Sequence, residues 1–254
     1  MYYPDIDKYA NLKSPIHSLE PCTKIISFTI LIFSVVFIEK MDMAVFSLAI
    51  AISILLLSRL PLKFILNRVK VILVFIIPIL ILMPFTVPGT VLWSFGLVVI
   101  SKEGIYFGFL VAIRSVTAII LTITLLGSQK FETTLKGLAL LKVPDSIIQI
   151  LLFTYRYIFV MIDEFICIWS AMRAKGYTFR ANRPGLLIIG NLVGMLLVKS
   201  YERAERVYRA MIAKGYTGKP VSFAPFLKTG RDYFAGIIII SLAFGLHLYP
   251  VMIS

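Results

Sequence analysis

Long apolar runs, separated by short charged or proline-containing turns, occupy the first half of the chain and its C-terminal end. A membrane-spanning helix needs about 20 consecutive apolar residues, and five runs reach or approach that length. They cover residues 24–38, 43–58, 69–85, 104–126 and 233–251. Two prolines, Pro78 and Pro84, break the third run. The pattern predicts about five transmembrane helices. The stretch 88–101 contains proline and glycine and is expected to form a partial or interfacial segment, with a sixth span as the alternative.

Residues 127–231 follow a different pattern, in which apolar runs lead into charged ones. The stretch KSYERAERVYRAMIAK places Glu202–Arg206 and Glu205–Arg209 at i,i+4 with the acid first, the order that favours a helix. The pattern predicts two long amphipathic helices, at 145–175 and 185–214, each starting after a proline. We expect them on the cytoplasmic face of the membrane, with their apolar sides against the bundle.

The composition agrees with a bilayer environment, because 59% of the residues are hydrophobic, 15% are charged and the mean hydropathy is +0.92. This mixture is too apolar for a soluble domain of this length. The 26 basic residues outnumber the 13 acidic ones. With a cytoplasmic N-terminus, all basic residues except Lys40, Lys102 and Arg114 face the cytoplasm, as the positive-inside rule requires. The positive charge therefore indicates membrane topology, and nucleic acid is not an expected partner.

The predicted fold class is an all-α integral membrane protein with three parts. Residues 1–126 form an N-terminal membrane bundle of about four spans. Residues 127–231 form a cytoplasmic domain with the two long helices, and residues 232–254 form a C-terminal transmembrane helix.

One short segment occurs twice, as AMRAKGYT at 171–178 and AMIAKGYT at 210–217, where each long helix is expected to end. Both copies contain Ala-Lys-Gly, at Ala174, Lys175 and Gly176 and again at Ala213, Lys214 and Gly215. The glycines fall where a left-handed C-cap residue is expected, and the lysines place a cation beside the negative end of the helix dipole. The segments are either ordinary capped helix ends or narrow tips that dock on another protein. A cap requires neither the repeated methionine nor the repeated tyrosine and threonine, so the repeat favours two equivalent docking sites.

Three stretches carry a resemblance to a known family. They are TYRYIFVMIDE at 154–164, SYERAERVYRAMIAKGYTG at 200–218 and IDKYANLKSPIHSLEPCTKI at 6–25. Together they resemble the transmembrane T component of energy-coupling-factor (ECF) transporters, most closely the cobalt/nickel, CbiQ-like branch. The resemblance extends over nearly the whole chain.

The resemblance implies a non-catalytic coupling and scaffold subunit of an ATP-driven importer in the cytoplasmic membrane of a prokaryote. In that family two long coupling helices dock by their tips on two ABC-type ATPases, and the T component holds a substrate-binding S component. The implied S component is CbiM-like, with or without a CbiN-like small subunit, and the implied cargo is cobalt or nickel, linked to cobalamin biosynthesis. The family motif at each tip is Ala-Arg-Gly, whereas this chain has Lys175 and Lys214. Lysine keeps the charge but loses the planar bidentate geometry of arginine.

Other functions are alternatives on the sequence. One is a shared T component for vitamin-specific S components, and another is a conventional ABC importer permease, which has one coupling helix rather than two. An integral-membrane enzyme and a secondary transporter are further alternatives. The sequence contains no GxxxxGK[ST] phosphate loop, so ATP and magnesium are expected on partner ATPases and no cofactor on this chain. His17 and His247 stand far apart in the sequence and provide no metal-ligating spacing.

Several charged residues within the predicted helices are candidates for structural or functional roles. They are Arg114, Arg156, Asp163, Glu164, Glu202 and Arg206. Arg114 lies within a predicted span, where a charge costs about 2.5–3.5 kcal/mol, so it is either paired within the bundle or functional. Asp163 and Glu164 are expected to pair with Arg156 or with other arginines of the two long helices. The GNLVG stretch at 190–194 predicts close packing between the two long helices.

Overall fold

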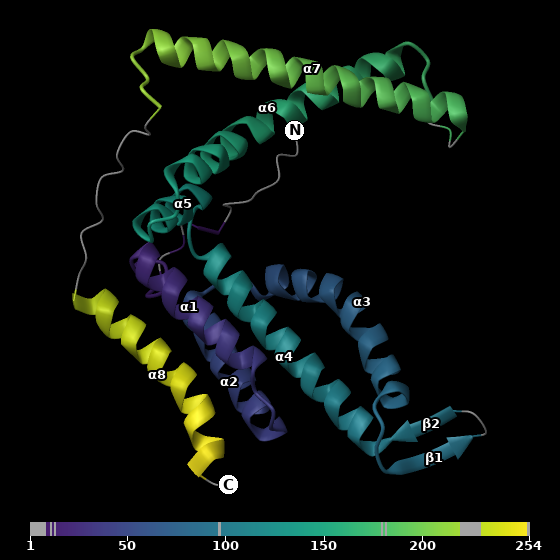
Figure 1. Ribbon diagram of the computed structural model, residues 1–254, viewed down its shortest axis with the longest axis vertical. Helices are drawn as coiled ribbons and strands as arrows, with labels where there is room; N and C mark the ends of the chain where they lie inside the picture. The colour runs from purple at the N-terminus through teal and green to yellow at the C-terminus, as the bar shows by residue number, and fades with distance from the viewer. Residues whose placement is uncertain are drawn as a thin grey trace. The chain divides into compact units, whose positions relative to one another are not determined.

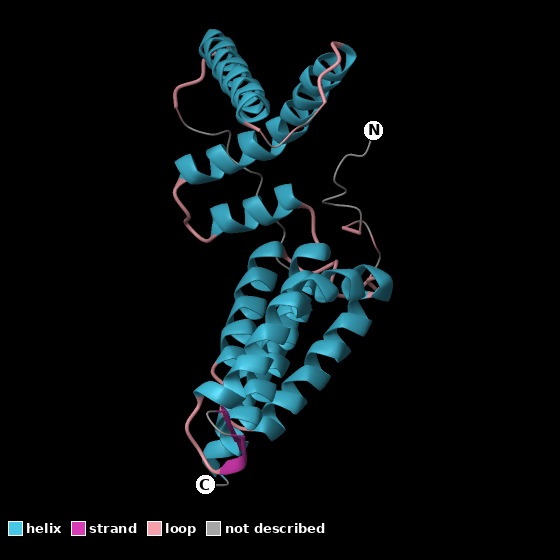
Figure 2. Cartoon of the chain, turned by 90° about the vertical axis from the view of Figure 1, so that its right-hand side faces the viewer, coloured by secondary structure: helices cyan, strands magenta, loops and turns pink. Residues whose placement is uncertain are grey.

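The computed structural model describes residues 9–10, 12, 14–95, 98–178, 180, 182–218 and 230–252. In these parts of the chain there are eight α-helices and one two-stranded β-hairpin (Figure 2). The chain divides into two compact units. We call the unit formed by residues 5–141 and 225–254 the bundle unit, and the unit that contains residues 142–224 the α6–α7 unit.

The bundle unit contains six of the helices and the hairpin. They are α1 (Pro21–Val36), α2 (Met41–Ser58), α3 (Leu62–Thr86), β1 (Val91–Phe95), β2 (Val98–Ser101), α4 (Lys102–Gly127), α5 (Phe131–Leu140) and α8 (Gly230–Met252). Helices α1–α4 and α8 coincide with the five predicted spans, which confirms the all-α membrane fold. By length and composition α2, α3 and α4 can cross a membrane, while α1 and the 232–247 part of α8 are shorter apolar helices.

Helix α1 packs against α4, α5 and α8 (Figure 1). Its residues Phe28, Leu31 and Val35 are at most 1% exposed and belong to the hydrophobic core. The hydroxyl of Ser34 donates a 2.8 Å hydrogen bond to the carbonyl oxygen of Ala243 on α8. Apolar contacts and a satisfied buried hydroxyl therefore join two helices from opposite ends of the sequence.

Helix α3 continues through Pro78 and Pro84, where the sequence analysis expected a break. Figure 1 shows that the helix bends along its length instead. Proline removes a helical hydrogen bond, which produces a bend when the rest of the helix is held in place. Helix α4 supports α3 at close range, because a Cβ atom at Gly104 would lie 2.7 Å from the carbonyl oxygen of Met83.

The stretch predicted as a partial or interfacial segment forms the β-hairpin, so it is not a sixth span. Its strands are antiparallel, and Phe95 pairs with Val98 next to the turn. Ser101 ends the hairpin and caps α4, since its hydroxyl accepts a 3.1 Å hydrogen bond from the Gly104 N–H and donates a 2.6 Å bond to the Val87 carbonyl. The hairpin therefore leads directly into the first turn of α4.

Buried polar groups join the helix ends of the bundle unit. Lys24 is among the basic residues predicted to face the cytoplasm, but its side chain lies within α1 and is only 1% exposed. Its ammonium group donates to the carbonyl oxygen and the hydroxyl of Ser128, at 3.4 and 3.3 Å. Ser128 is the C-cap of α4, so the buried lysine supplies a cation to the negative end of that helix.

The α6–α7 unit begins at Lys142, directly after α5. Helix α5 therefore groups with the bundle, although the sequence analysis placed it with the long helices. A Cβ atom at Gly137 of α5 would lie 3.1 Å from the Pro21 side chain, so the two helices approach closely. Lys142 itself has a φ of 62°, in the left-handed region, where a side chain is disfavoured.

The unit consists of two long helices, α6 (Asp145–Ala174) and α7 (Arg183–Ala213), close to the predicted bounds. The Asn182 side chain caps α7 by accepting a 2.9 Å hydrogen bond from the Gly185 N–H. By length and composition α7 is also apolar enough to cross a membrane. Between Arg183 and Lys199 the helix carries no charged residue, and its other charged residues follow Lys199, which is the two-part pattern that the sequence shows.

Candidate functional site

Both copies of the repeat end their helices with the same backbone structure. Gly176 and Gly215 have φ angles of 85° and 84°. At the end of α6 the N–H of Tyr177 donates to the carbonyl of Met172 at 3.1 Å, and the N–H of Gly176 donates to the carbonyl of Arg173 at 3.0 Å. Equivalent bonds end α7. This is the Schellman motif, which satisfies the last carbonyl groups and requires a left-handed residue at the glycine.

The seven positions that are identical in the two copies differ in exposure. The methionine and tyrosine of each copy are half-buried, at Met172 and Tyr177 and at Met211 and Tyr216. The Ala-Lys-Gly positions are exposed in both copies, from Ala174 to Gly176 and from Ala213 to Gly215. Within the described residues, no salt bridge or side-chain hydrogen bond involves Lys175 or Lys214. Each tip therefore presents a cation and a narrow backbone, while the methionine and tyrosine face the protein.

The hydroxyl groups of the two repeated tyrosines form hydrogen bonds within the α6–α7 unit. The Tyr177 hydroxyl donates a 3.2 Å hydrogen bond to the carbonyl of Gly185, at the start of α7. The Tyr216 hydroxyl donates a 2.8 Å hydrogen bond to the side-chain oxygen of Gln149, near the start of α6. The sequence analysis found no structural use for the repeated tyrosine, whereas the structure gives it one. The partner of Tyr177 is 8 residues away and that of Tyr216 is 67 residues away, so the second contact in particular depends on the tertiary structure.

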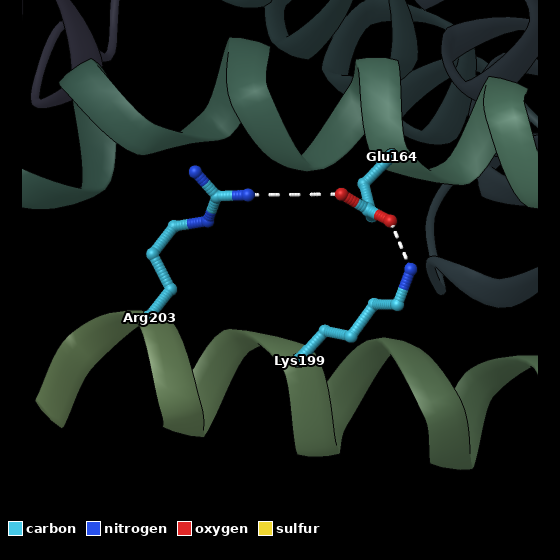
Figure 3. A network of polar contacts seen from close by, with 3 residues as sticks. All are labelled: Glu164, Lys199 and Arg203. Carbon is cyan, nitrogen blue, oxygen red and sulfur yellow. Dashed lines mark hydrogen bonds and ion pairs between the residues drawn. The ribbon is translucent and has the colours of Figure 1, made fainter. Parts of the chain in front are cut away.

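A polar contact joins the middle of the two long helices. The carboxylate of Glu164 on α6 lies between Lys199 and Arg203 of α7 (Figure 3). Lys199 donates a short hydrogen bond to one carboxylate oxygen, and Arg203 lies 3.6 Å from the other. The hydrogen bond from Lys199, with the charges of Lys199 and Arg203, lowers the pKa of Glu164. Arg203 is one of the long-helix arginines expected as a partner of Glu164, whereas the contact with Lys199 was not predicted.

The three side-chain contacts show how the two helices run. They join residues 8, 35 and 67 positions apart in the sequence, so each successive contact lies farther from the loop between the helices. This is the register of an antiparallel αα-hairpin, and Figure 1 shows α6 and α7 crossing at an angle. We call the pair the α6–α7 hairpin, with a loop end at Tyr177 and an open end at Tyr216.

The two tips lie at opposite ends of this hairpin. The first tip follows α6 at the loop end, and the second follows α7 at the open end, beside Gln149. From Gln149 to Ala174 the helix rises by about 38 Å, at about 1.5 Å per residue. The two copies of the motif are therefore about 40 Å apart, so they can contact two separate protein surfaces.

A cavity of about 390 Å³ lies between the two helices. It extends from Met161, near the middle contact, to Tyr216 at the open end. Phe153 and Tyr157 of α6 and Met211 of α7 are among the residues that line it. The helices are therefore not closely packed in the half of the hairpin that leads to the second tip.

The remaining predicted residues have varied surroundings. Arg114 lies in α4, and its Nε atom is buried without a hydrogen-bond partner among the described residues. The guanidinium of Arg156 lies 6.0 Å from the ring centre of Tyr157, on its own helix. Asp163 also lies on α6, half-buried. None of these three side chains belongs to either tip.

Of the two ion pairs predicted along α7, one is present among the described residues. Glu205 and Arg209 form a 2.5 Å ion pair, as the spacing predicts. Glu202 and Arg206 are both described, and no ion pair joins them. The prediction of close helix packing at the GNLVG stretch is wrong, because no atom among the described residues lies within 4 Å of a Cβ atom built at Gly190 or Gly194. The contacts between the two helices nearest this stretch along α7 are made by the long side chains of Lys199 and Arg203.

A search of the described residues for metal sites finds no group of three or more His, Cys, Asp or Glu side chains. His17 makes a hydrogen bond with Ser14 at 2.7 Å and one with the Tyr9 carbonyl at 3.0 Å. Burial lowers the pKa of His17, opposed by the hydrogen bond to Tyr9, while the charge of Lys24 lowers it further. His247 contacts the carbonyl of Ser34 at 3.1 Å, between α8 and α1. Both histidines therefore act within the structure of the bundle unit.

These features define a class of protein, namely a multi-pass membrane protein that carries a pair of long helices with two equivalent cationic tips. The model of the CbiQ family, described as cobalt transport protein, matches residues 12–223, and the chain belongs to this family. Curated relatives place it among the transmembrane components of ECF transporters.

Three of these relatives carry the name energy-coupling factor transporter transmembrane protein EcfT. The protein from Exiguobacterium sibiricum is 30% identical, over 75% of this chain and 77% of its own length. The protein from Streptococcus thermophilus is 29% identical, over 96% of this chain and 97% of its own length. The protein from Bacillus subtilis is 26% identical, over 94% and 95%. The similarity therefore covers both the bundle unit and the α6–α7 unit.

Proposed function

We propose that this chain is the coupling and scaffold subunit of an ATP-driven importer, in which the two tips of the α6–α7 hairpin each dock on one ABC-type ATPase. The ATPases bind and hydrolyse ATP, and the chain itself carries out no catalysis. Motion of the two ATPases reaches the membrane through α6 and α7 and reorients a substrate-binding S component.

The observation that carries this proposal is the division within each repeat. Ala174–Gly176 and Ala213–Gly215 are exposed and have the same backbone structure, while the tyrosine that follows each glycine is half-buried. Two identical presented surfaces about 40 Å apart fit two copies of one partner, or two related partners. A single coupling contact, as in a conventional importer permease, leaves the second copy without a role.

The tips favour an acidic partner surface. Lys175 and Lys214 are exposed, and each lies at the C-terminal end of a helix, where the dipole attracts a cation. An acidic groove competes with that dipole for the lysine, and a lysine contributes a point charge rather than a bidentate pair. Docking therefore depends on salt, because exposed charges interact over about 8 Å at physiological ionic strength.

A charge-reversal series tests the docking role. Lys175→Glu and Lys214→Glu are each expected to weaken recovery of the ATPases with the purified protein, and the double variant is expected to abolish it. Arg206→Glu is the matched control, since it reverses an exposed charge on α7 away from the tip. Full ATPase recovery with the double variant would falsify the docking role.

For the cargo, we propose cobalt or nickel, in the service of cobalamin biosynthesis. The matching family model is described as a cobalt transport protein. The names of the EcfT relatives specify no cargo, so a shared T component for vitamin-specific S components is the alternative. A CbiM-like S component, with or without a CbiN-like small subunit, is the expected membrane partner in a prokaryotic cytoplasmic membrane, with the N-terminus of this chain in the cytoplasm.

Purification of the protein from its native membrane in mild detergent, followed by mass spectrometry, decides the cargo. Recovery of ABC ATPases with a CbiM-like protein supports cobalt or nickel. A vitamin-type S component would leave the mechanism intact and overturn the cargo. Absence of any ATPase would contradict the coupling role.

A further inference from the structure

We propose that the hydrogen bond between Tyr216 and Gln149 is a clasp that positions the second tip, by holding the open end of the α6–α7 hairpin. The bond is 2.8 Å long and joins residues 67 positions apart in the sequence. It connects the residue directly after Gly215 to the second turn of α6. Gln149 and Tyr216 are therefore positioning residues for the docking site at Lys214.

The two ends of the hairpin differ in what holds them. At the loop end, residues 175–182 join α6 to α7 covalently, so the bond from Tyr177 to Gly185 adds to a connection that already exists. At the open end, the start of α6 follows α5 and the end of α7 precedes α8 in the chain, so no loop joins α6 directly to α7 there. The same tyrosine of the repeat thus has a local use in the first copy and a long-range use in the second.

Side-chain packing between α6 and α7 does not hold the open end of the hairpin in place of the hydrogen bond. Between the Glu164 contact and Tyr216, the helices border a partly open cavity of about 390 Å³ rather than a filled interface. A close-packed interface resists movement because every displacement produces a clash, whereas a cavity allows the helices to approach or separate. In the open half of the hairpin, the Tyr216–Gln149 bond is therefore the contact best placed to fix the separation of the helices.

The surroundings favour a strong bond. Gln149 and Tyr216 are both half-buried, and the cavity beside them is lined mainly by aromatic and methionine side chains, including Phe153, Tyr157 and Met211. Hydrogen bonds are stronger in apolar surroundings than in water. Loss of a hydrogen bond of about 1 kcal/mol corresponds to about a fivefold change in the ratio of clasped to open hairpin.

The distance between the two tips and the distance from the second tip to the start of α6 depend on different parts of the hairpin. The distance between the tips depends on the length of α7, because the first tip lies beside the start of α7 and the second follows its end. The distance from the second tip to the start of α6 depends on the clasp. Release of the clasp is therefore expected to change the second distance and leave the first unchanged.

Double electron–electron resonance, which measures distances between pairs of spin labels, tests this expectation in the full-length protein in lipid nanodiscs. One label pair, at Ser146→Cys and Thr217→Cys, spans the open end, and the other, at Thr178→Cys and Thr217→Cys, spans the two tips. All three labelled positions are exposed, and the exposed Cys167 is replaced by serine. The buried Cys22 is left in place, and a protein without introduced cysteines measures its labelling.

Tyr216→Phe is expected to raise the open population in the 146–217 distances about fivefold and to leave the 178–217 distances unchanged. Tyr177→Phe is the matched control and is expected to change neither. Gln149→Leu is expected to act like Tyr216→Phe, and the double variant like either single one, because they remove the same bond. Gln149→Glu keeps an acceptor and is expected to keep the clasp. An unchanged 146–217 distribution in Tyr216→Phe, or equal broadening in Tyr177→Phe, overturns the proposal.

The link to transport rests on the proposed docking function and has its own measurement. In the complex with its ATPases and S component, reconstituted in liposomes, Tyr216→Phe is expected to lower transport per ATP hydrolysed while ATPase recovery stays at the wild-type level. Unchanged coupling in a variant with a broadened 146–217 distribution would overturn the functional part of this proposal. Failure of the wild-type protein to bind any ATPase would instead contradict the docking function and leave the distance result standing.

Discussion

The glycine caps of the two tips provide a sharp test of the local structure, because one substitution has opposite expected effects at different positions. Gly176 and Gly215 have φ angles of 85° and 84°, and no atom among the described residues lies within 4 Å of a Cβ atom added to either. Replacement by alanine therefore produces no clash. Its cost is the left-handed backbone itself, about 1 kcal/mol for each residue with a side chain.

Gly190 is the matched control. It lies inside α7, and a Cβ atom there also meets open space. Because its backbone is helical, Gly190→Ala is expected to stabilise the helix by about 0.5–1 kcal/mol. The same change from glycine to alanine therefore loosens the tips and strengthens the helix interior.

Hydrogen exchange with mass spectrometry measures both effects, on peptides that cover 171–178, 210–217 and the middle of α7. A loss of about 1 kcal/mol corresponds to about fivefold faster exchange at the helix end. Gly176→Ala and Gly215→Ala are expected to accelerate exchange at their own tip, and Gly190→Ala to slow exchange around residue 190. Unchanged or slower exchange at a tip after its glycine is replaced would refute the left-handed cap as the origin of the backbone structure that the two tips share.

Further predictions concern three charged residues, Lys142, Lys24 and Glu164. Lys142→Gly is expected to stabilise the protein by about 1 kcal/mol in thermal unfolding, since Lys142 has a φ of 62°, and a destabilised variant would contradict this. Lys24→Ala is expected to cost about 2 kcal/mol, because it leaves a cavity and removes the cation from Ser128; an unchanged melting temperature in detergent would argue against this role. The lowered pKa of Glu164 means that its contact stabilises the hairpin above the ordinary glutamate pKa of about 4.3 and that this stabilisation disappears as pH falls through the lower folded value. Nuclear magnetic resonance of the Glu164 carboxyl is expected to show this titration and a higher pKa in Lys199→Ala, and titration in the ordinary range in both proteins would contradict it.

The amino-acid sequence alone determines the features that depend on local physics. Apolar runs of sufficient length become helices α1–α4 and α8 because a bilayer requires internal backbone hydrogen bonds. Gly176 and Gly215 end their helices because a left-handed residue is needed there. The duplicated tips, the two long helices and the resemblance to ECF T components are likewise evident in the order of the residues. Each of them depends on neighbouring residues or on a pattern along the chain.

The tertiary structure alone decides the features that depend on residues far apart in the sequence. The sequence leaves several arginines as partners for Glu164, and the antiparallel register of α6 and α7 selects Arg203 and adds Lys199. The small-residue stretch around Gly190 is compatible with close helix packing, yet the crossing of the helices leaves it open. The partner of Tyr216 follows from the same register. The equivalent tyrosines of the two copies have different partners, because Tyr177 bonds to Gly185 at one end of the hairpin and Tyr216 bonds to Gln149 at the other. Local propensity is a property of neighbouring residues, whereas a contact between helices depends on the path of the whole chain between them.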